Sequence, residues 1–286
     1  MTRRVGLLGK PLKRRHSQVM HDAAFDAAGI DARYVLLELE PEAVEPAVQE
    51  ARESDAWLGL GVTAPYKRVV AGLVDAVEPD AERIGAVNNV VREASGRLVG
   101  INTDAPGFRA GAELAMGRSL SDATVVVVGA GGAAHAVVYA CLEAGARWVT
   151  IANRTDSTAR ALADRFLGVG KGSAVAIPPS GLVFEAALAG ADLAVNATTV
   201  GMLDPGMTIP VDRLPATATV FDLVYVPAET SLVAAARARG LRAANGSEML
   251  IAQAAIAFER WTGVGGMADV MRTAVAPLLA DPTVRA

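Results

Sequence analysis

The sequence is poor in several features that mark common classes of protein. Its 286 residues contain one cysteine, Cys141, so no disulfide can form within the chain, which is typical of a reducing compartment. The net charge of -4 provides no strong field to recruit nucleic acid or an anionic membrane. The most apolar window, 124–138, is broken by glycines and His135, so we expect no membrane span. The first ten residues lack the apolar segment of a signal peptide. We therefore expect a soluble cytoplasmic protein.

Metal-binding and nucleic-acid-binding patterns are also missing. His16, His21 and His135 lack metal-ligand spacing and the chain has no cysteine cluster, so we expect no metal. The basic run KRRH at 13–16 is short and carries no interleaved aromatic residues, so we expect no nucleic-acid partner. The sequence leaves open whether the protein is a monomer or a homodimer.

What the sequence does have is a large apolar fraction arranged in alternating segments. Hydrophobic residues make up 52% and charged residues 20%, enough for a sizeable core, and the length suits two domains. Short β-branched runs alternate with alanine-rich stretches, which predicts an α/β fold with mainly parallel sheets. The expected strands are 5–8, 34–39, 58–62, 86–92, 98–102, 194–196 and 220–223. Residues 124–154 are expected to form a strand, a glycine-rich turn, a helix and a second strand, in that order. The expected helices are 17–28, 42–53, one from about 106, and 247–279, and a loop is expected at 168–173.

A glycine-rich turn marks a candidate nucleotide site. Residues 129–134, GAGGAA, follow four valines and open a predicted helix, which satisfies the G-x-G-x-x-G/A pattern in the required context. The first glycine makes the tight turn, the second lets a pyrophosphate approach the backbone, and Ala134 keeps the helix close to the sheet. The helix N-terminus offers free N–H groups and partial positive charge. The alternative is a turn needed only for packing.

The end of the next predicted strand bears on the choice of cofactor. Proteins that bind NAD carry an acid there for the ribose 2′-hydroxyl, whereas this chain reads Ala-Asn-Arg-Thr at 152–155. The guanidinium of Arg154 can hold a 2′-phosphate, so the sequence favours NADP over NAD. The nearby Asp156 weakens that preference, and Arg154 as a solvated surface charge is the alternative.

Eight segments together resemble the shikimate dehydrogenase family, in matching order and over nearly the whole chain. They are GVTAPYK (61–67), IGAVNNV (84–90), GINTDAPG (100–107), GAGGAA (129–134), NRT (153–155), NATTVGM (196–202), DLVYVPAET (222–230) and NGSEMLIAQAAIAFERWTG (245–263). The resemblance implies a substrate-binding domain of residues 1–105 with C-terminal helices from 244–286, and an NADP-binding Rossmann domain of residues 106–243. It implies interconversion of 3-dehydroshikimate and shikimate, or of a related alicyclic hydroxy acid, within aromatic amino acid and chorismate biosynthesis.

The resemblance also implies site residues. Lys67 would be the catalytic acid/base and Asp104 its partner carboxylate, because a lysine bonded to the reacting oxygen can move its proton while a carboxylate orients it. The implied substrate contacts are Ser17, Thr63, Asn88, Asn102, Tyr225 and Gln253. The implied cofactor contacts are Gly129, Ala130, Gly131, Gly132, Ala133, Asn153, Arg154, Thr155, Thr198 and Gly246. The simpler alternatives are unrelated surface charges for Lys67 and Asp104, a helix cap for Thr63 and a turn for Asn88.

The chain departs from the family pattern mainly near its N-terminus. Arg15 stands where the family has the first of two carboxylate-binding serines, and the other departures are Arg14, Gln18, Asp22, Gly61 and Thr199. Arg15 either grips a carboxylate or turns to solvent with Lys13 and Arg14, leaving Ser17 as a helix N-cap. We therefore hypothesise that shikimate is bound less well than by a standard family member. A quinate/shikimate dehydrogenase preferring NAD, a divergent paralogue with another substrate, and a non-enzymatic NADP-binding sensor remain alternatives.

Overall fold

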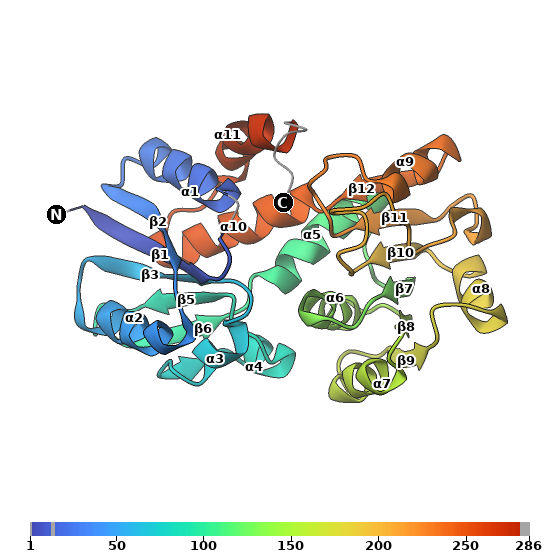
Figure 1. The fold of residues 1–286 in the computed structure, drawn as a ribbon, viewed down its shortest axis with the longest axis horizontal. Helices are drawn as coiled ribbons and strands as arrows, with labels where there is room; N and C mark the ends of the chain where they lie inside the picture. The colour runs from blue at the N-terminus through green and yellow to red at the C-terminus, as the bar shows by residue number, and fades with distance from the viewer. Residues whose placement is uncertain (1, 13–14, 281–286) are drawn as a thin grey trace. The chain divides into compact units, whose positions relative to one another are not determined.

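The computed structural model describes residues 2–12 and 15–280, which form two compact units (Figure 1). The first unit runs to Thr103 and resumes at Ile251–Leu278, and the second comprises Asp104–Leu250. The divisions implied by the family resemblance lie at 105/106 and 243/244. Both units are built from β-strands with covering helices, so the α/β fold class is confirmed.

The first unit contains a mixed six-stranded sheet of order β2-β1-β3-β5-β6-β4. Its strands are β1 (Arg3–Gly9), β2 (Ala32–Glu38), β3 (Trp57–Val62), β4 (Ala76–Val77), β5 (Asn89–Arg92) and β6 (Leu98–Ile101). Its helices are α1 (His16–Ala27), α2 (Pro41–Glu53), α3 (Lys67–Ala71), α4 (Pro79–Ile84), and most of α10 (Ser247–Thr262) and α11 (Ala268–Ala280). Strand β5 runs antiparallel to both β3 and β6, whereas β1 pairs in parallel with β2 and β3.

Strand β3 is buried along its whole length, because helices cover both faces of the sheet around it. On one face, Trp261 of α10 donates its indole N–H to Val90 O at 2.9 Å, and Phe258 packs on Phe25 of α1 with ring centroids 5.0 Å apart. Helix α10 therefore completes the core of this unit although it lies about 150 residues further along the chain than β6.

Two sequence-based expectations for this unit need correction. The strand predicted from residue 86 begins at Asn89, because the backbone before it bonds outside the ladder, with Val87 N donating to Lys67 O at 3.0 Å. The helical stretch predicted for 247–279 is two helices, separated where Gly263 and Gly266 adopt φ of 74° and 78°. Left-handed glycines of this kind end helices.

The second unit contains a fully parallel six-stranded sheet of order β12-β11-β10-β7-β8-β9. Its strands are β7 (Thr124–Val128), β8 (Trp148–Ala152), β9 (Ser173–Ile177), β10 (Leu193–Asn196), β11 (Thr219–Asp222) and β12 (Arg242–Asn245). Its helices are α5 (Asp104–Met116), α6 (Gly132–Glu143), α7 (Asp156–Arg165), α8 (Leu182–Ala189), the 3-10 turn η1 (Val211–Arg213) and α9 (Ser231–Ala238). The strand order reverses between β7 and β10, and at such a switch point ligands bind doubly wound sheets.

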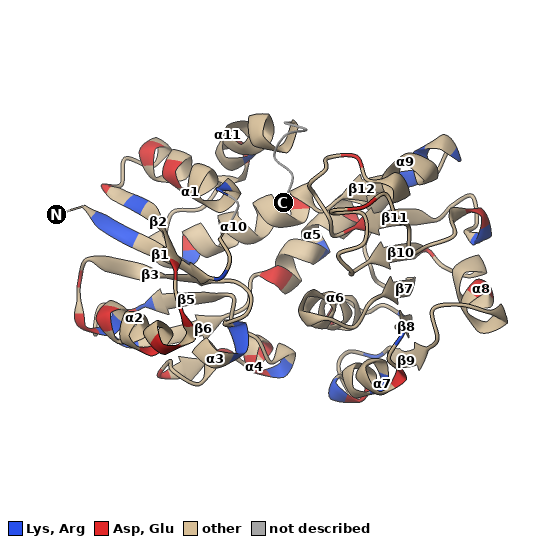
Figure 2. Ribbon diagram, in the orientation of Figure 1, with Lys and Arg blue, Asp and Glu red and all other residues tan. Residues whose placement is uncertain are grey.

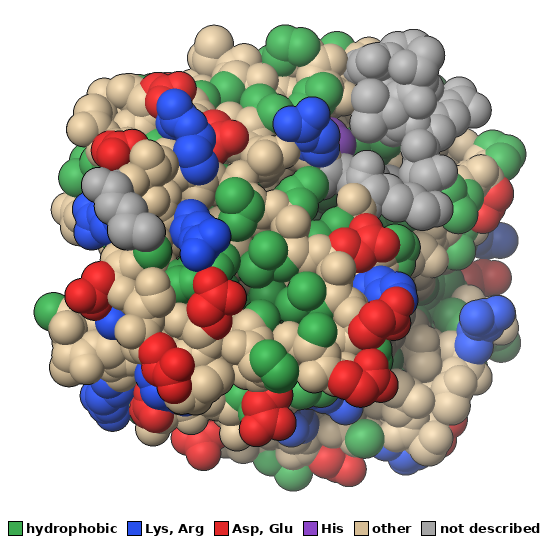
Figure 3. Space-filling view, turned by 60° about the vertical axis from the view of Figure 1, so that its left-hand side comes forward, with side chains coloured by type: hydrophobic (Ala, Val, Ile, Leu, Met, Phe, Trp, Pro, Cys, Tyr) green, Lys and Arg blue, Asp and Glu red, His purple; other side chains and the backbone are tan. Residues whose placement is uncertain are grey.

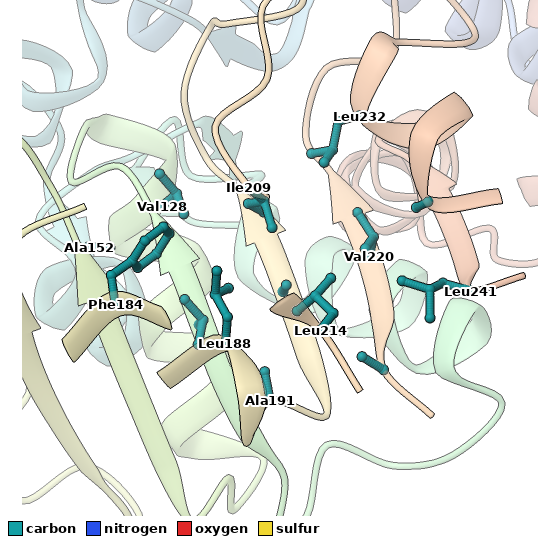
Figure 4. Packing of buried hydrophobic residues seen from close by; sticks show 14 of the residues in the cluster. Val128, Ala152, Phe184, Leu188, Ala191, Ile209, Leu214, Val220, Leu232 and Leu241 are labelled. Atoms are coloured by element: carbon teal, nitrogen blue, oxygen red, sulfur yellow. The ribbon is translucent and has the colours of Figure 1, made fainter. Parts of the chain in front are cut away.

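The core of the second unit joins this sheet to the helices on one of its faces. Phe184 and Leu188 project from α8 toward the strands, and Leu232 of α9 belongs to the same cluster (Figure 4). Phe184, Leu188 and Leu232 are each at most 2% exposed. This packing fixes the sheet whose carboxyl ends carry the predicted nucleotide site.

The surface carries charges of both signs. Helix α7 carries both arginine and aspartate, whereas the charged residues of α1 are acidic and those of α2 mostly so (Figure 2). The face shown in Figure 3 likewise intermixes acidic and basic side chains with apolar ones. Within the described residues, none of the helices is both long and apolar enough to cross a membrane.

Candidate active site

The glycine-rich turn leaves β7 at the switch point of the parallel sheet. Gly129 has a φ of 109°, a backbone conformation that favours glycine, and its N–H donates to Ala152 O at 2.9 Å. A Cβ at this position would lie 2.9 Å from Ala197 O and from Thr198 Cγ2. Glycine is therefore required here both by the backbone and by the closeness of the loop that follows β10.

The next two glycines lie in open space. Gly131 and Gly132 are exposed, and apart from the adjoining backbone no described atom lies within 4 Å of where a Cβ would stand on either. Gly131 is the N-cap of the twelve-residue helix α6, whereas Ala134 is fully buried against the sheet. An uncovered turn at a helix N-terminus is the environment that a pyrophosphate needs. The residues present thus fit a dinucleotide, with Ala130 and Ala133 beside the glycines.

Strand β8 pairs with β7, which leads into the glycine-rich turn, and the end of β8 carries exposed polar side chains. Arg154 and Thr155 are exposed, and Asn153 Nδ2 donates to Thr155 O at 3.0 Å. Asp156 pairs with Arg160 one helical turn later, with 2.6 Å between Oδ2 and Nε. The acid that weakened the preference for NADP is therefore already engaged by a cation. Sequence reasoning did not select Arg160, although the spacing of four residues within a helix is a detectable signal.

Two further predicted cofactor residues lie along the carboxyl edge of the same sheet. Thr198 follows β10 and packs against Gly129 as described above. Gly246 follows β12, and a Cβ there would lie only 2.3 Å from Leu223 O in the segment after β11. Tyr225, a predicted substrate contact, is half-buried in that segment.

In the first unit, the ends of β3 and β5 bring several predicted residues together. Thr63 N donates to Leu8 O at 2.8 Å, and Val62 N donates to Asn88 O at 2.8 Å. Lys67 is half-buried as the first residue of α3, and its carbonyl accepts from Val87 N. The N-cap of α3 is Tyr66 and not Thr63, so the alternative of Thr63 as a cap is wrong.

Thr103 joins Asn88 and Asn89 to Gln253, and sequence reasoning missed it. Its hydroxyl accepts from Asn88 Nδ2 at 3.1 Å and Asn89 Nδ2 at 2.9 Å, and donates to Gln253 Oε1 at 3.3 Å. Its N–H donates to Asn88 Oδ1 at 2.8 Å. These contacts use both acceptor sites and the single hydrogen of the hydroxyl, so Thr103 fixes how the two amides face it. The available signal was its place between Asn102 and Asp104.

The two residues that flank Thr103 differ in their surroundings. Asn102 is 8% exposed and donates from Nδ2 to Ala86 O at 2.9 Å. Asp104 is half-buried as the first residue of α5 and of the second unit. The predicted proton-transfer pair, Lys67 and Asp104, therefore comes from different units. Each begins a helix shortly after one predicted substrate residue, Thr63 and Asn102 respectively.

Comparison with known proteins identifies the family. The family models for the shikimate dehydrogenase substrate binding domain, shikimate / quinate 5-dehydrogenase and the shikimate 5′-dehydrogenase C-terminal domain match residues 7–90, 111–200 and 246–276. A relative from Rubrobacter xylanophilus, named shikimate dehydrogenase (NADP(+)), is 43% identical over 274 residues, 95% of this chain and 94% of the relative. The chain belongs to the shikimate dehydrogenase family. The resemblance drawn from the eight segments is confirmed.

Solved shikimate dehydrogenase relatives share the fold of the whole chain. The shikimate 5-dehydrogenase of Thermus thermophilus, in complex with NADP(H) and shikimate, is 37% identical with a TM-score of 0.84, covering 96% of this chain and 99% of that one. The quinate dehydrogenase of Corynebacterium glutamicum, in complex with NAD, is 35% identical with a TM-score of 0.89, again covering 96% and 99%.

The main departure from the shikimate dehydrogenase pattern, Arg15, turns to solvent. Arg15 is exposed, and its Nε donates to Gln18 Oε1 at 2.8 Å, while Gln18 Nε2 donates to Tyr34 O at 3.0 Å. Gln18, which replaces the usual proline, thus anchors the arginine to β2. Arg15 itself occupies the N-cap position of α1, so the alternative in which Ser17 caps the helix is wrong. Lys13 and Arg14 lie outside the described residues.

No metal centre is evident in the part of the chain that the structure describes, where no three His, Cys, Asp or Glu side chains are grouped as a metal site would require.

Proposed function

We propose that the protein is an NADP-dependent oxidoreductase that interconverts 3-dehydroshikimate and shikimate, or a closely related alicyclic hydroxy acid. The observation that carries this proposal is the bonding of Asn88 and Gln253 to Thr103, beside the end of β3 that leads into Thr63 and Lys67, present together with an open dinucleotide turn on a parallel sheet. The relative from Rubrobacter xylanophilus is named for this NADP-dependent activity. The first unit is then the substrate unit and the second the cofactor unit.

The nicotinamide cofactor would exchange a hydride with the ring carbon that carries the reacting oxygen. The exposed turn at Gly131 and Gly132 would hold its pyrophosphate, and Arg154 its 2′-phosphate. Because Asp156 is paired with Arg160, a 2′-phosphate there meets an excess of positive charge. This excess favours NADP over NAD.

Lys67 would move the proton that accompanies hydride transfer. Its ammonium donates a proton to the oxygen when the ketone is reduced and recovers it when the alcohol is oxidised, while the Asp104 carboxylate orients the lysine. The polar side chains of Ser17, Thr63, Asn88, Asn102, Tyr225 and Gln253 would bind the ring hydroxyls and the carboxylate. Arg15, which is exposed and bonded to Gln18, would contact the substrate carboxylate only if it left this bond.

The experiment is a set of initial rates for NADP and NAD with shikimate and with quinate. Strong NADP-linked turnover of shikimate supports the proposal and makes Arg15 a tolerated variation. Preference for quinate with NAD supports the second candidate function, which the likeness to a quinate dehydrogenase favours.

Lys67→Ala should abolish turnover and leave NADP binding intact, and unchanged turnover would remove Lys67 from the mechanism. NADP binding without turnover of either acid would favour another substrate or a sensor. A cytoplasmic location stays a prediction.

A further inference from the structure

A chain of buried hydrogen bonds joins the carboxyl ends of β10 and β11. Asp222, the last residue of β11, is 0% exposed. Its Oδ1 accepts from Asn196 Nδ2 at 2.8 Å and from Val224 N at 3.1 Å, and its Oδ2 accepts from Thr230 Oγ1 at 2.7 Å. Burial raises the pKa of this carboxyl, and the bonds from Thr230, Val224 and Asn196 oppose that rise. Burying a carboxylate is costly unless it is bonded in this way.

Asp222 determines which way the Asn196 amide faces. Asn196 Oδ1 accepts from Thr198 N at 3.2 Å and Thr198 Oγ1 at 2.7 Å, and also from Thr208 Oγ1 at 3.1 Å. Asn196 Nδ2 donates to Asp222 and to Val200 O, the latter at 3.1 Å. A backbone N–H only donates and an ionised carboxylate only accepts, so the amide has a single satisfied orientation.

The loop that Asn196 holds lies directly against the glycine-rich turn. Ala197 N donates to Val128 O at 2.8 Å, at the end of β7. Ala197 O and Thr198 Cγ2 both stand 2.9 Å from where a Cβ of Gly129 would be. A change in the backbone conformation of residues 197–201 would therefore move the atoms that contact Gly129. Because protein interiors are close-packed, loss of the hydrogen bonds at Asp222 would be transmitted through these contacts to the turn.

Asp222 also binds the backbone of the segment that follows β11. Its bond to Val224 N directs the segment toward Tyr225, and Gly246 N donates to Val224 O at 3.4 Å. Thr230 meanwhile caps α9, accepting from Val233 N at 3.3 Å while donating to Asp222. One carboxylate thus ties together the loops after β10 and β11.

We propose that Asp222 is a positioning residue for the dinucleotide, holding Asn196 and through it the loop 197–201 against the turn at Gly129. The inference rests on the proposed function, because it assumes that this turn binds NADP. Asp222 itself need not touch the cofactor. An apolar residue of similar size would satisfy the packing but would leave Asn196 Nδ2 and Val224 N without their acceptor.

The test measures the Kd for NADPH by fluorescence titration for wild type, Asp222→Ala, Asp222→Asn and Asn196→Ala, at a temperature where circular dichroism finds each folded. Asp222→Ala and Asn196→Ala should each weaken NADPH binding about tenfold or more, since they break the same tie from its two ends. Asp222→Asn keeps an oxygen that accepts from Asn196 and Val224 N, while its NH2 group donates to the Thr230 hydroxyl and so reverses that bond; the variant should stay within about threefold of wild type. If Asp222→Ala does not fold, Asn196→Ala carries the test.

The control is Val220→Ala, which removes buried volume from the same strand without touching the loop. It should lose stability but keep the wild-type Kd. Equal loss of NADPH affinity in the control, or Asp222→Ala and Asn196→Ala binding as wild type does, would overturn the inference while leaving the proposed function standing. Absence of NADPH binding by the wild type would overturn both.

Discussion

His21 should make the first unit sensitive to mild acid. The ring is fully buried on α1, stacked on Tyr34 with centroids 4.6 Å apart and tilted against Trp261 at 5.1 Å. Burial among these aromatic rings lowers the pKa of His21 from 6.5 to about 3. The unfolded chain therefore binds a proton below pH 6.5 that the folded chain refuses until about pH 3. The part of the unfolding free energy that comes from keeping His21 neutral is fully present above pH 6.5. It is lost as the pH falls from about 6.5 toward about 3.

The size of the effect follows from this difference in pKa. One pKa unit corresponds to about 1.36 kcal/mol, so lowering the pH from 7.5 to 5.5 should cost about 1.4 kcal/mol through His21 alone. His21→Phe keeps an aromatic ring in the stack and removes the titrating group. The variant should lose about 1.4 kcal/mol less than wild type between these two pH values, because other groups titrate alike in both proteins.

The assay is urea denaturation at pH 7.5 and 5.5, followed by tryptophan fluorescence, since Trp261 touches His21. Phe258→Leu is the control, because Phe258 belongs to the same cluster and carries no proton. It should lower stability at both pH values while keeping the wild-type acid dependence. If His21→Phe loses as much stability as wild type on acidification, the ring is not held neutral by burial and the reasoning is wrong.

Four further outcomes are expected. Thr103→Val should raise the KM for shikimate about tenfold with an unchanged Kd for NADPH, because two buried amides lose their acceptor; an unchanged KM in steady-state assays would contradict this. Arg154→Ala should raise the KM for NADP and leave that for NAD unchanged, and equal effects on both cofactors would refute a 2′-phosphate contact. Gly129→Ala should lower stability by about 1–3 kcal/mol in thermal unfolding, since its φ of 109° strains any side chain, and wild-type behaviour would count against the turn geometry. Leu188→Ala should cost about 2–5 kcal/mol in urea, and a much smaller loss would mean that the cavity collapses.

Elements defined by neighbouring residues could be predicted from the sequence. Strand β7, the glycine turn and the start of α6 form one continuous stretch, and each step has its own local signature of β-branched residues, glycines and alanines. The family followed from eight such stretches. The antiparallel pairing of β5 with β6 follows from the short turn 93–97 that joins them. The antiparallel pairing of β5 with β3 could not be predicted, because a short buried strand carries the same pattern in either direction.

The tertiary structure decided what depends on partners far apart in the sequence. Thr103 meets Gln253 across 150 positions, and Asp222 meets Asn196 across 26, so neither contact leaves a periodic or compositional trace. The direction of Arg15 likewise depends on Gln18 and on its bond to Tyr34 O in β2. The sequence by itself determined the kind of fold, the family and the candidate chemistry, because these rest on local patterns. Which amide faces which hydroxyl was decided only by folding, because a hydrogen bond depends on positions in space.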